Sequence, residues 1–275
     1  MAKISLKKGI LDVVLYIIVF IVAQLVILYA GAGIWAAVKH EGFQATLQAM
    51  KAGGNPALLA ITTVFSSIIT LIVFLKAKWV VLTRDYLLSK PWFTLLWVAL
   101  FTLGAIIPLE FLYEHLGLEM DENTGKLFAG LMKEPWGYVA VGILVPLTEE
   151  IVFRGAILRS LLDMMSKKNH WVAIMISAAM FGLAHGNAAQ FVNALLMGLL
   201  LGWMYYRTKS LVPGILMHWV NNTMAYILAN LVPQSDGKLI DLFGGNEQTV
   251  YYAVGFSLCI LIPSFIQMII RLKKA

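Results

Sequence analysis

Charged residues are scarce in this sequence. They make up 13% of its 275 residues, whereas hydrophobic residues make up 60% and the mean hydropathy is +0.80. An average soluble domain has about 25% charged and about 45–50% apolar residues. The shortage of charge therefore excludes an ordinary soluble domain and indicates a chain solvated by lipid. The net charge of +6 does not indicate nucleic-acid binding, because the basic residues flank apolar runs. In that position, attraction to anionic lipid headgroups and the positive-inside rule account for them.

Cysteine is nearly absent. Cys259 is alone, which excludes a disulfide framework and a cysteine metal cluster. The first apolar run, Ile10 to about Ala37, exceeds the ~7–15 residues of a cleaved signal peptide, so we expect a retained helix, with cleavage near Gly31–Gly33 as the alternative. We find no internal repeat or low-complexity tract and expect one transmembrane domain over residues 1–275.

Eight apolar stretches approach the ~20 residues that a helix needs to cross the hydrocarbon core. Backbone polar groups in lipid must pair internally, and these runs do not alternate as barrel strands do, so we expect helices. The predicted fold class is all-α, a polytopic membrane protein of about eight transmembrane helices with a central polar cavity. The predicted spans are Ile10–Val38, Ala57–Leu75, Trp92–Tyr113, Trp136–Leu162, Trp171–His185, Phe191–Tyr206, Val212–Leu231 and Val250–Ile270.

The connections between these spans differ in charge. Of the 21 basic residues, 16 fall in one alternating set of connections and 5 in the other. This asymmetry predicts that both termini are cytoplasmic. The longest connection, Glu114 to Glu134, mixes charged and apolar residues, which predicts either a short interfacial helix or a solvated loop.

Three clusters of polar residues lie inside predicted spans, where an ionisable group costs at least ~2.5–3.5 kcal/mol and indicates function. The first runs from Pro146 to Arg154. Glu150 and Arg154 are four residues apart and are expected to pair on one helix face. Glu149 points about 100° away and is the candidate proton acceptor. The alternative, in which both glutamates are structural ion-pair partners, is favoured for Glu150 but not for Glu149.

The second cluster runs from Phe181 to His185, which share a helix face, and it ends beside the turn Gly186-Asn187. The third cluster holds His218 and Asn222, which also share a helix face. Taken alone, His185 would more often be a structural residue at an interface, whereas His218 and Asn222 are equally compatible with structural hydrogen bonding between helices. Together the clusters supply a base, a second imidazole and a pair of hydrogen-bond donors, which amide hydrolysis requires. A proton-coupled transporter uses the same residue types and remains an alternative.

The three clusters resemble the CPBP family, which includes the CAAX prenyl proteases of the Ras-converting type and bacterial Abi, or bacteriocin self-immunity, proteins. That family shows Glu-Glu-x-x-x-Arg, Phe-x-x-x-His and His-x-x-x-Asn on successive core helices. In this sequence they read Glu149-Glu150-Ile-Val-Phe-Arg154, Phe181-Gly-Leu-Ala-His185 and His218-Trp-Val-Asn-Asn222, within a core of about residues 136–231.

The resemblance implies a CAAX-protease-like intramembrane endopeptidase. It implies that Glu149 and His185 activate the attacking water, and that His218 and Asn222 form the oxyanion hole. Glu150, Arg154 and Phe181 would support the site. Two non-enzymatic alternatives are a membrane scaffold and a bacteriocin-immunity protein.

The family is often called a metalloprotease, and Glu149, His185 and His218 match a zinc site of two histidines and one glutamate. The sequence lacks His-Glu-x-x-His, so we expect no obligatory cofactor, with zinc as the alternative. It also lacks the Gly-x-Ser-Gly and Gly-x-Gly-Asp motifs of other intramembrane proteases. The expected partners are membrane lipid and a peptide or protein substrate, lipidated or not, in a bacterial cell membrane.

The predicted topology places His185 and His218 at different depths if the helices are straight. A shared site therefore requires broken or offset helices. Pro146, Gly182 and the pair Pro213-Gly214 are the positions that permit them.

Overall fold

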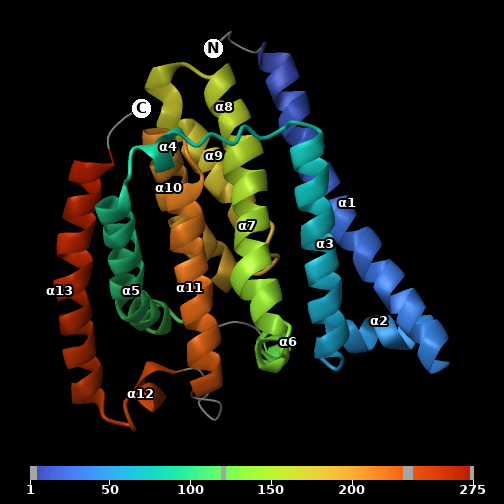
Figure 1. Cartoon of the computed structure of the whole chain (residues 1–275). Coiled ribbons are helices and arrows are strands. Elements are labelled where there is room, and N and C mark those ends of the chain that lie inside the picture. Colours follow the sequence, from blue (N-terminus) through green and yellow to red (C-terminus); the bar gives the residue numbers. More distant parts are fainter. Residues whose placement is uncertain (1–4, 119–121, 232–237, 273–275) are drawn as a thin grey trace. The chain divides into compact units, whose positions relative to one another are not determined.

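A computed structural model describes residues 5–118, 122–231 and 238–272, and every regular element in these ranges is a helix (Figure 1). The all-α prediction is therefore confirmed for the described residues. The chain divides into two compact units. Unit 1 comprises Met1–Leu82 and Met120–Trp203, and unit 2 comprises Thr83–Glu119 and Met204–Ala275.

Unit 1 begins with two long apolar helices that lie side by side (Figure 1). Each starts at a side-chain cap: Ser5 Oγ accepts from Lys8 N, and Asn55 Oδ1 accepts from Leu58 N, which satisfies amides of the first turn. The helical elements of unit 1 are α1 (Leu6–Lys39), α2 (Phe43–Lys51), α3 (Pro56–Lys76), α6 (Glu122–Lys133), η1 (Tyr138–Leu144), α7 (Val145–Glu149), η2 (Glu150–Leu158), α8 (Arg159–Met164), η3 (Lys167–Asn169), α9 (His170–Leu183) and most of α10 (Ala188–Thr208).

Unit 2 is built around a close helix pair, α5 (Trp92–His115) and α13 (Glu247–Arg271) (Figure 1). Gly104 of α5 permits the approach, because a Cβ there would lie 2.8 Å from Leu261 N and 3.2 Å from Ser257 O of α13. The remaining helices of this unit are α4 (Asp85–Leu88), the end of α10, α11 (Val212–Leu231) and α12 (Leu239–Leu242).

All eight predicted spans coincide with helical stretches, but these stretches are not equivalent. Five helices, α1, α3, α5, α10 and α13, are long and apolar enough to cross a membrane among the described residues. The fourth predicted span is divided among η1, α7, η2 and α8, and α9 has only 14 residues. The several apolar helices support an integral membrane protein, while the count of eight spans and the orientation stay predictions. The connection between the third and fourth spans contains the predicted short helix, α6.

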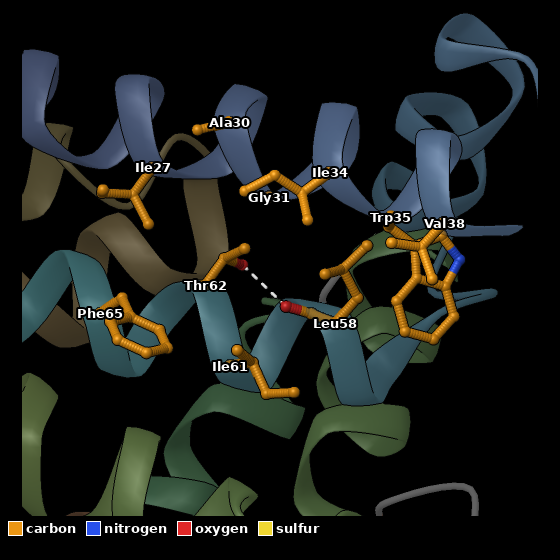
Figure 2. Close-up of a pocket in the computed structure, with 10 residues that line it drawn as sticks. All are labelled: Ile27, Ala30, Gly31, Ile34, Trp35, Val38, Leu58, Ile61, Thr62 and Phe65. Atoms are coloured by element: carbon orange, nitrogen blue, oxygen red, sulfur yellow. Dashed lines mark hydrogen bonds between the residues drawn. The ribbon is translucent and has the colours of Figure 1, made fainter.

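An apolar groove of ≈ 450 Å³ lies between α1 and α3 (Figure 2). The small residues Ala30 and Gly31 line it on the α1 side. Its one hydroxyl group belongs to Thr62 and donates to the carbonyl oxygen of Leu58 at 2.9 Å, so this group is already satisfied within α3. Large apolar side chains complete the lining: Ile27, Ile34, Trp35, Val38, Leu58, Ile61 and Phe65.

Candidate functional site

The first motif lies where the helical hydrogen-bond pattern changes. Glu149 ends α7 and Glu150 begins η2, a π-helical stretch, and a second π-helical stretch, η1, precedes α7. Pro146 accounts for the first change, because it has no N–H and its ring would clash with the carbonyl of Gly142, four residues earlier, in a regular α-helix. Nothing in the sequence of Glu150–Leu158 accounts for η2. Departures of this kind often occur at functional sites.

Glu150 and Arg154 form the predicted ion pair. Arg154 Nη1 lies 2.8 Å from Glu150 Oε1, and each side chain is only 1% exposed. Gly198 of α10 packs directly against this pair, since a Cβ at that position would lie 3.2 Å from Arg154 Nη2. A buried pair of this kind is strongly destabilised when one partner is removed, because the other charge is then left in a low dielectric. Both residues therefore hold the local structure of the motif.

Phe181 connects the first motif to the second. The Arg154 guanidinium carbon lies 4.4 Å from the centroid of the Phe181 ring, a favourable cation–π geometry. The same ring meets His185 edge to face, with centroids 5.0 Å apart and an interplanar angle of 87°. Ser177 Oγ adds a hydrogen bond to the carbonyl oxygen of Phe153, which joins α9 to η2. Unit 1 thus brings the first two motifs together through packed side chains.

His185 is held in one orientation just beyond the end of α9. Its Nδ1 lies 2.9 Å from the carbonyl oxygen of Phe181. A carbonyl can only accept, so Nδ1 carries the hydrogen and Nε2 keeps its lone pair for a proton or a metal. Gly186 then turns the chain with φ +76°, and Asn187 Oδ1 accepts from Gln190 N to start α10. The predicted turn is confirmed.

Glu149 lines a small polar pocket inside unit 1. The pocket has a volume of ≈ 60 Å³ and lies among α1, α3 and α7. The sequence analysis missed this site, although the hydroxyl residues of α3 recur at i, i+3, i+4 and i+7, which predicts one polar face on an apolar helix. The lining residues are Phe20, Gln24, Thr63, Ser66, Ser67, Thr70, Val145, Thr148 and Glu149.

The third motif lies in unit 2. His218 and Asn222 occupy successive turns of α11, His218 is 3% exposed, and Asn222 Oδ1 accepts from Asn221 Nδ2 at 3.2 Å. Their shared face on one helix is as predicted, whereas their convergence with Glu149 and His185 of unit 1 stays a prediction.

The predicted helix breaks are found at only some of the four positions. Pro146 coincides with the change in hydrogen-bond pattern, and Gly182 lies in the last turn of α9. Pro213 and Gly214 lie instead in the first turn of α11, where a missing N–H costs nothing, and so they begin a helix rather than break one.

Comparison with known proteins finds relatives of the motif-bearing core. Residues 131–224 match the family described as type II CAAX prenyl endopeptidase Rce1-like. The chain is 28% identical over 153 residues to the "Putative membrane peptidase YdiL" of Bacillus subtilis (strain 168), covering 54% of this chain and 61% of the relative. It is 30% identical over 150 residues to the "Membrane-embedded CAAX protease MroQ" of Staphylococcus aureus (strain USA300), covering 53% and 60%.

A third relative is the "UPF0177 protein YxdF" of Lactococcus lactis subsp. lactis (strain IL1403), 30% identical over 104 residues, covering 38% of this chain and 51% of the relative. The matches thus span between about half and three fifths of the length of these curated relatives. No solved structure gives a significant match. These likenesses support the family predicted from the three motifs, because the motif-bearing core of this chain is similar to membrane CAAX-type proteases.

Proposed function

We propose that this chain is an intramembrane endopeptidase that hydrolyses a peptide bond of a membrane-associated substrate. The observation that carries the proposal is the arrangement in unit 1. There Glu149 opens on a polar pocket, while the neighbouring Glu150 is neutralised by Arg154. The Arg154 side chain rests on Phe181, which in turn packs against His185. This arrangement supports a structural role for Glu150 and a catalytic role for Glu149.

The proposed reaction uses these groups in two proton transfers. The oxygen of a water molecule attacks the scissile carbonyl carbon while one water proton passes to the Glu149 carboxylate, and His185 Nε2 accepts a hydrogen bond from the same water. His218 and Asn222 donate hydrogen bonds to the developing oxyanion. The proton held by Glu149 then passes to the leaving amine nitrogen as the carbon–nitrogen bond breaks.

The substrate class follows from the setting of the site. The polar groups lie on helices of a membrane protein, so the scissile bond belongs to a peptide or protein that is itself in or at the membrane. The S. aureus relative is named a CAAX protease, and we therefore include lipidated substrates in this class. We place the chain in a bacterial cell membrane, with both termini cytoplasmic.

The side chains of the proposed site determine whether it could bind a metal ion. Glu149 and the Nε2 lone pair of His185 are suitable zinc ligands, and His218 would be the third. Within each unit, the described residues gather no group of three or more His, Cys, Asp or Glu side chains able to hold a metal. We propose hydrolysis without an obligatory metal, and we expect cleavage to persist after dialysis against a strong chelator. Loss of cleavage that added zinc restores would contradict this part of the proposal.

The decisive experiment replaces the base alone. Membranes from cells that produce the wild-type protein or Glu149→Gln are compared by mass spectrometry of new peptide termini. Glutamine keeps the size and hydrogen bonding of the side chain but cannot take a proton, so cleavage should fall by about 10²–10⁴-fold. Glu122→Gln, the same chemical change at an exposed position of α6, is the matched control and should cleave normally.

The same comparison separates the alternatives. A membrane scaffold or an immunity protein of non-enzymatic type should produce no new termini with any of the three proteins. New peptide termini that form at the same level in Glu149→Gln as in the wild-type protein would contradict the proposed role of Glu149.

A further inference from the structure

An unsatisfied hydroxyl group marks the pocket beside Glu149. Thr148 lines this pocket and is 3% exposed, and its Oγ1 has no hydrogen-bond partner within the described residues. A buried hydroxyl without a partner is costly, and in native folds such groups usually bind ordered water. Thr148 is therefore a donor whose acceptor is not supplied by the described residues.

Three of the α3 hydroxyl groups that line the pocket can act only as acceptors towards it. Thr63 donates its single hydroxyl hydrogen to the carbonyl oxygen of Leu59 at 2.8 Å, and Thr70 donates to that of Ser66, also at 2.8 Å. Ser66 in turn donates to the carbonyl oxygen of Thr63 at 3.0 Å. A hydroxyl has one hydrogen and two lone pairs, so these three groups can offer only lone pairs to the pocket.

Water is the molecule that fits this set of groups. An ionised Glu149 offers only lone pairs, so it cannot bond directly to these three hydroxyl oxygens. A water molecule has two hydrogens for such acceptors and a lone pair for the Thr148 hydroxyl. The pocket volume of ≈ 60 Å³ exceeds the ~10–15 Å³ that one buried water requires.

We propose that this pocket is a permanent water site that supplies Glu149, and that Thr148 is the positioning residue that orients the water. The catalytic part of this inference rests on the proposed function. Each turnover consumes one water, whose oxygen joins the carbonyl carbon and whose two protons end on the two products. A site among apolar helices needs a local source for that water, and the pocket provides one on the side of α1 and α3.

The first test uses stability and does not depend on activity. Thr148→Val keeps the shape of the side chain and removes the hydroxyl. In a dry pocket this change removes an unsatisfied group and should stabilise the protein, whereas in a hydrated pocket it removes a hydrogen bond to water. The matched control is Thr62→Val on α3, because Thr62 lines the apolar groove rather than the pocket beside Glu149, and its hydroxyl donates to the carbonyl oxygen of Leu58 (Figure 2).

We expect the apparent Tm of Thr148→Val to lie about 2–4 °C below that of the wild-type protein, the shift that one net hydrogen bond produces in a protein of about this size. The measurement is thermal unfolding of the full chain in detergent, followed by intrinsic fluorescence. A Tm for Thr148→Val equal to or above that of the wild-type protein would overturn the water site.

The second test measures turnover of a peptide identified by the terminus comparison. Thr148→Val should lower kcat about tenfold and leave KM unchanged, because the residue orients water and does not touch substrate. Thr148→Ser restores the hydroxyl and should recover kcat to within about twofold, and Thr62→Val should change neither constant. A normal kcat in Thr148→Val would overturn the positioning role.

The two tests separate the inference from the proposed function. If the wild-type protein cleaves no peptide, the proposed function fails, but the Tm comparison still decides whether the pocket holds water. If cleavage requires Glu149 but is indifferent to Thr148, the function stands and this inference fails.

Discussion

Glu122 and Glu150 each pair with a basic residue four positions later in the chain, but the first pair is exposed to solvent and the second is buried. Glu122 pairs with Lys126 on α6 at 2.5 Å, with side chains that are 81% and 63% exposed. Glu150 pairs with Arg154 at 2.8 Å, with both side chains 1% exposed. The spacing gives both pairs the same local geometry. The spacing does not determine solvent exposure, and solvent exposure determines how much each ion pair contributes to stability.

The exposed pair is screened by water and contributes little to stability. The buried pair carries a desolvation cost that only tight pairing and further contacts can offset. Those contacts are present, because Arg154 lies over the Phe181 ring and Phe181 packs against His185. The buried pair is therefore tied to the second motif, while the exposed pair belongs to its own helix alone.

The largest expected effect comes from breaking the buried pair at one end. Arg154→Met leaves the Glu150 charge unpaired in the interior and should lower the free energy of unfolding by ~3–5 kcal/mol. The double variant Glu150→Leu/Arg154→Met removes both charges and should recover most of that loss. Denaturant unfolding of the three proteins in detergent measures the difference. A double variant no more stable than Arg154→Met would contradict the view that the cost comes from the orphaned charge.

A smaller effect is expected where the buried pair meets the second motif. Phe181→Leu keeps an apolar side chain but removes the ring under Arg154, so it should cost ~1–3 kcal/mol from lost ring packing and cation–π attraction. It should also lower peptide turnover, because the ring helps to orient His185. Phe101→Leu on α5 is the control, since Phe101 is likewise a buried phenylalanine in contact with another aromatic ring, that of Phe265. Equal loss of turnover in both variants would remove any special role of Phe181.

The sequence predicted those parts of the site that depend on neighbours along the chain. The Glu150–Arg154 pair, the shared face of Phe181 and His185 and the turn at Gly186 all follow from helical spacing or from a single residue, and all are present. The eight helical stretches follow from the apolar runs. These features need no knowledge of tertiary packing.

What the sequence analysis missed depends on contacts between distant segments. No sequence pattern distinguishes Thr148 as a site residue, and its pocket forms only because the hydroxyl face of α3 packs against α7. The π-helical stretch after Glu149 has no signal in its sequence, since hydrogen-bond register within a helix is set by packing around it. The contact between the Arg154 guanidinium and the Phe181 ring joins residues of separate helices, so its geometry does not follow from the two sequence motifs.

The smallest expected effect concerns the exposed pair. The hydrogen bond from Lys126 and its positive charge lower the pKa of the Glu122 carboxyl. Because this pKa is lower in the folded state, the stabilisation is present above the unfolded-state pKa and is lost as the pH falls through the folded-state pKa. Lys126→Ala should raise the pKa of Glu122 towards its ordinary value and leave the Tm at neutral pH unchanged within error. Carbon NMR titration of the labelled carboxyl measures the shift.

The two ion pairs should also differ in their dependence on salt concentration. At about 1 M salt the Debye length is near 3 Å, so the effect of Lys126 on Glu122 should shrink in the wild-type protein. The Glu150–Arg154 pair is buried and should be far less sensitive, so the stability gap between wild-type protein and Arg154→Met should survive the same salt. If salt reduced that gap as strongly as it reduces the Glu122 shift, the buried pair would have to be in contact with bulk water, and the separation of a structural Glu150 from a water-facing Glu149 would fail with it.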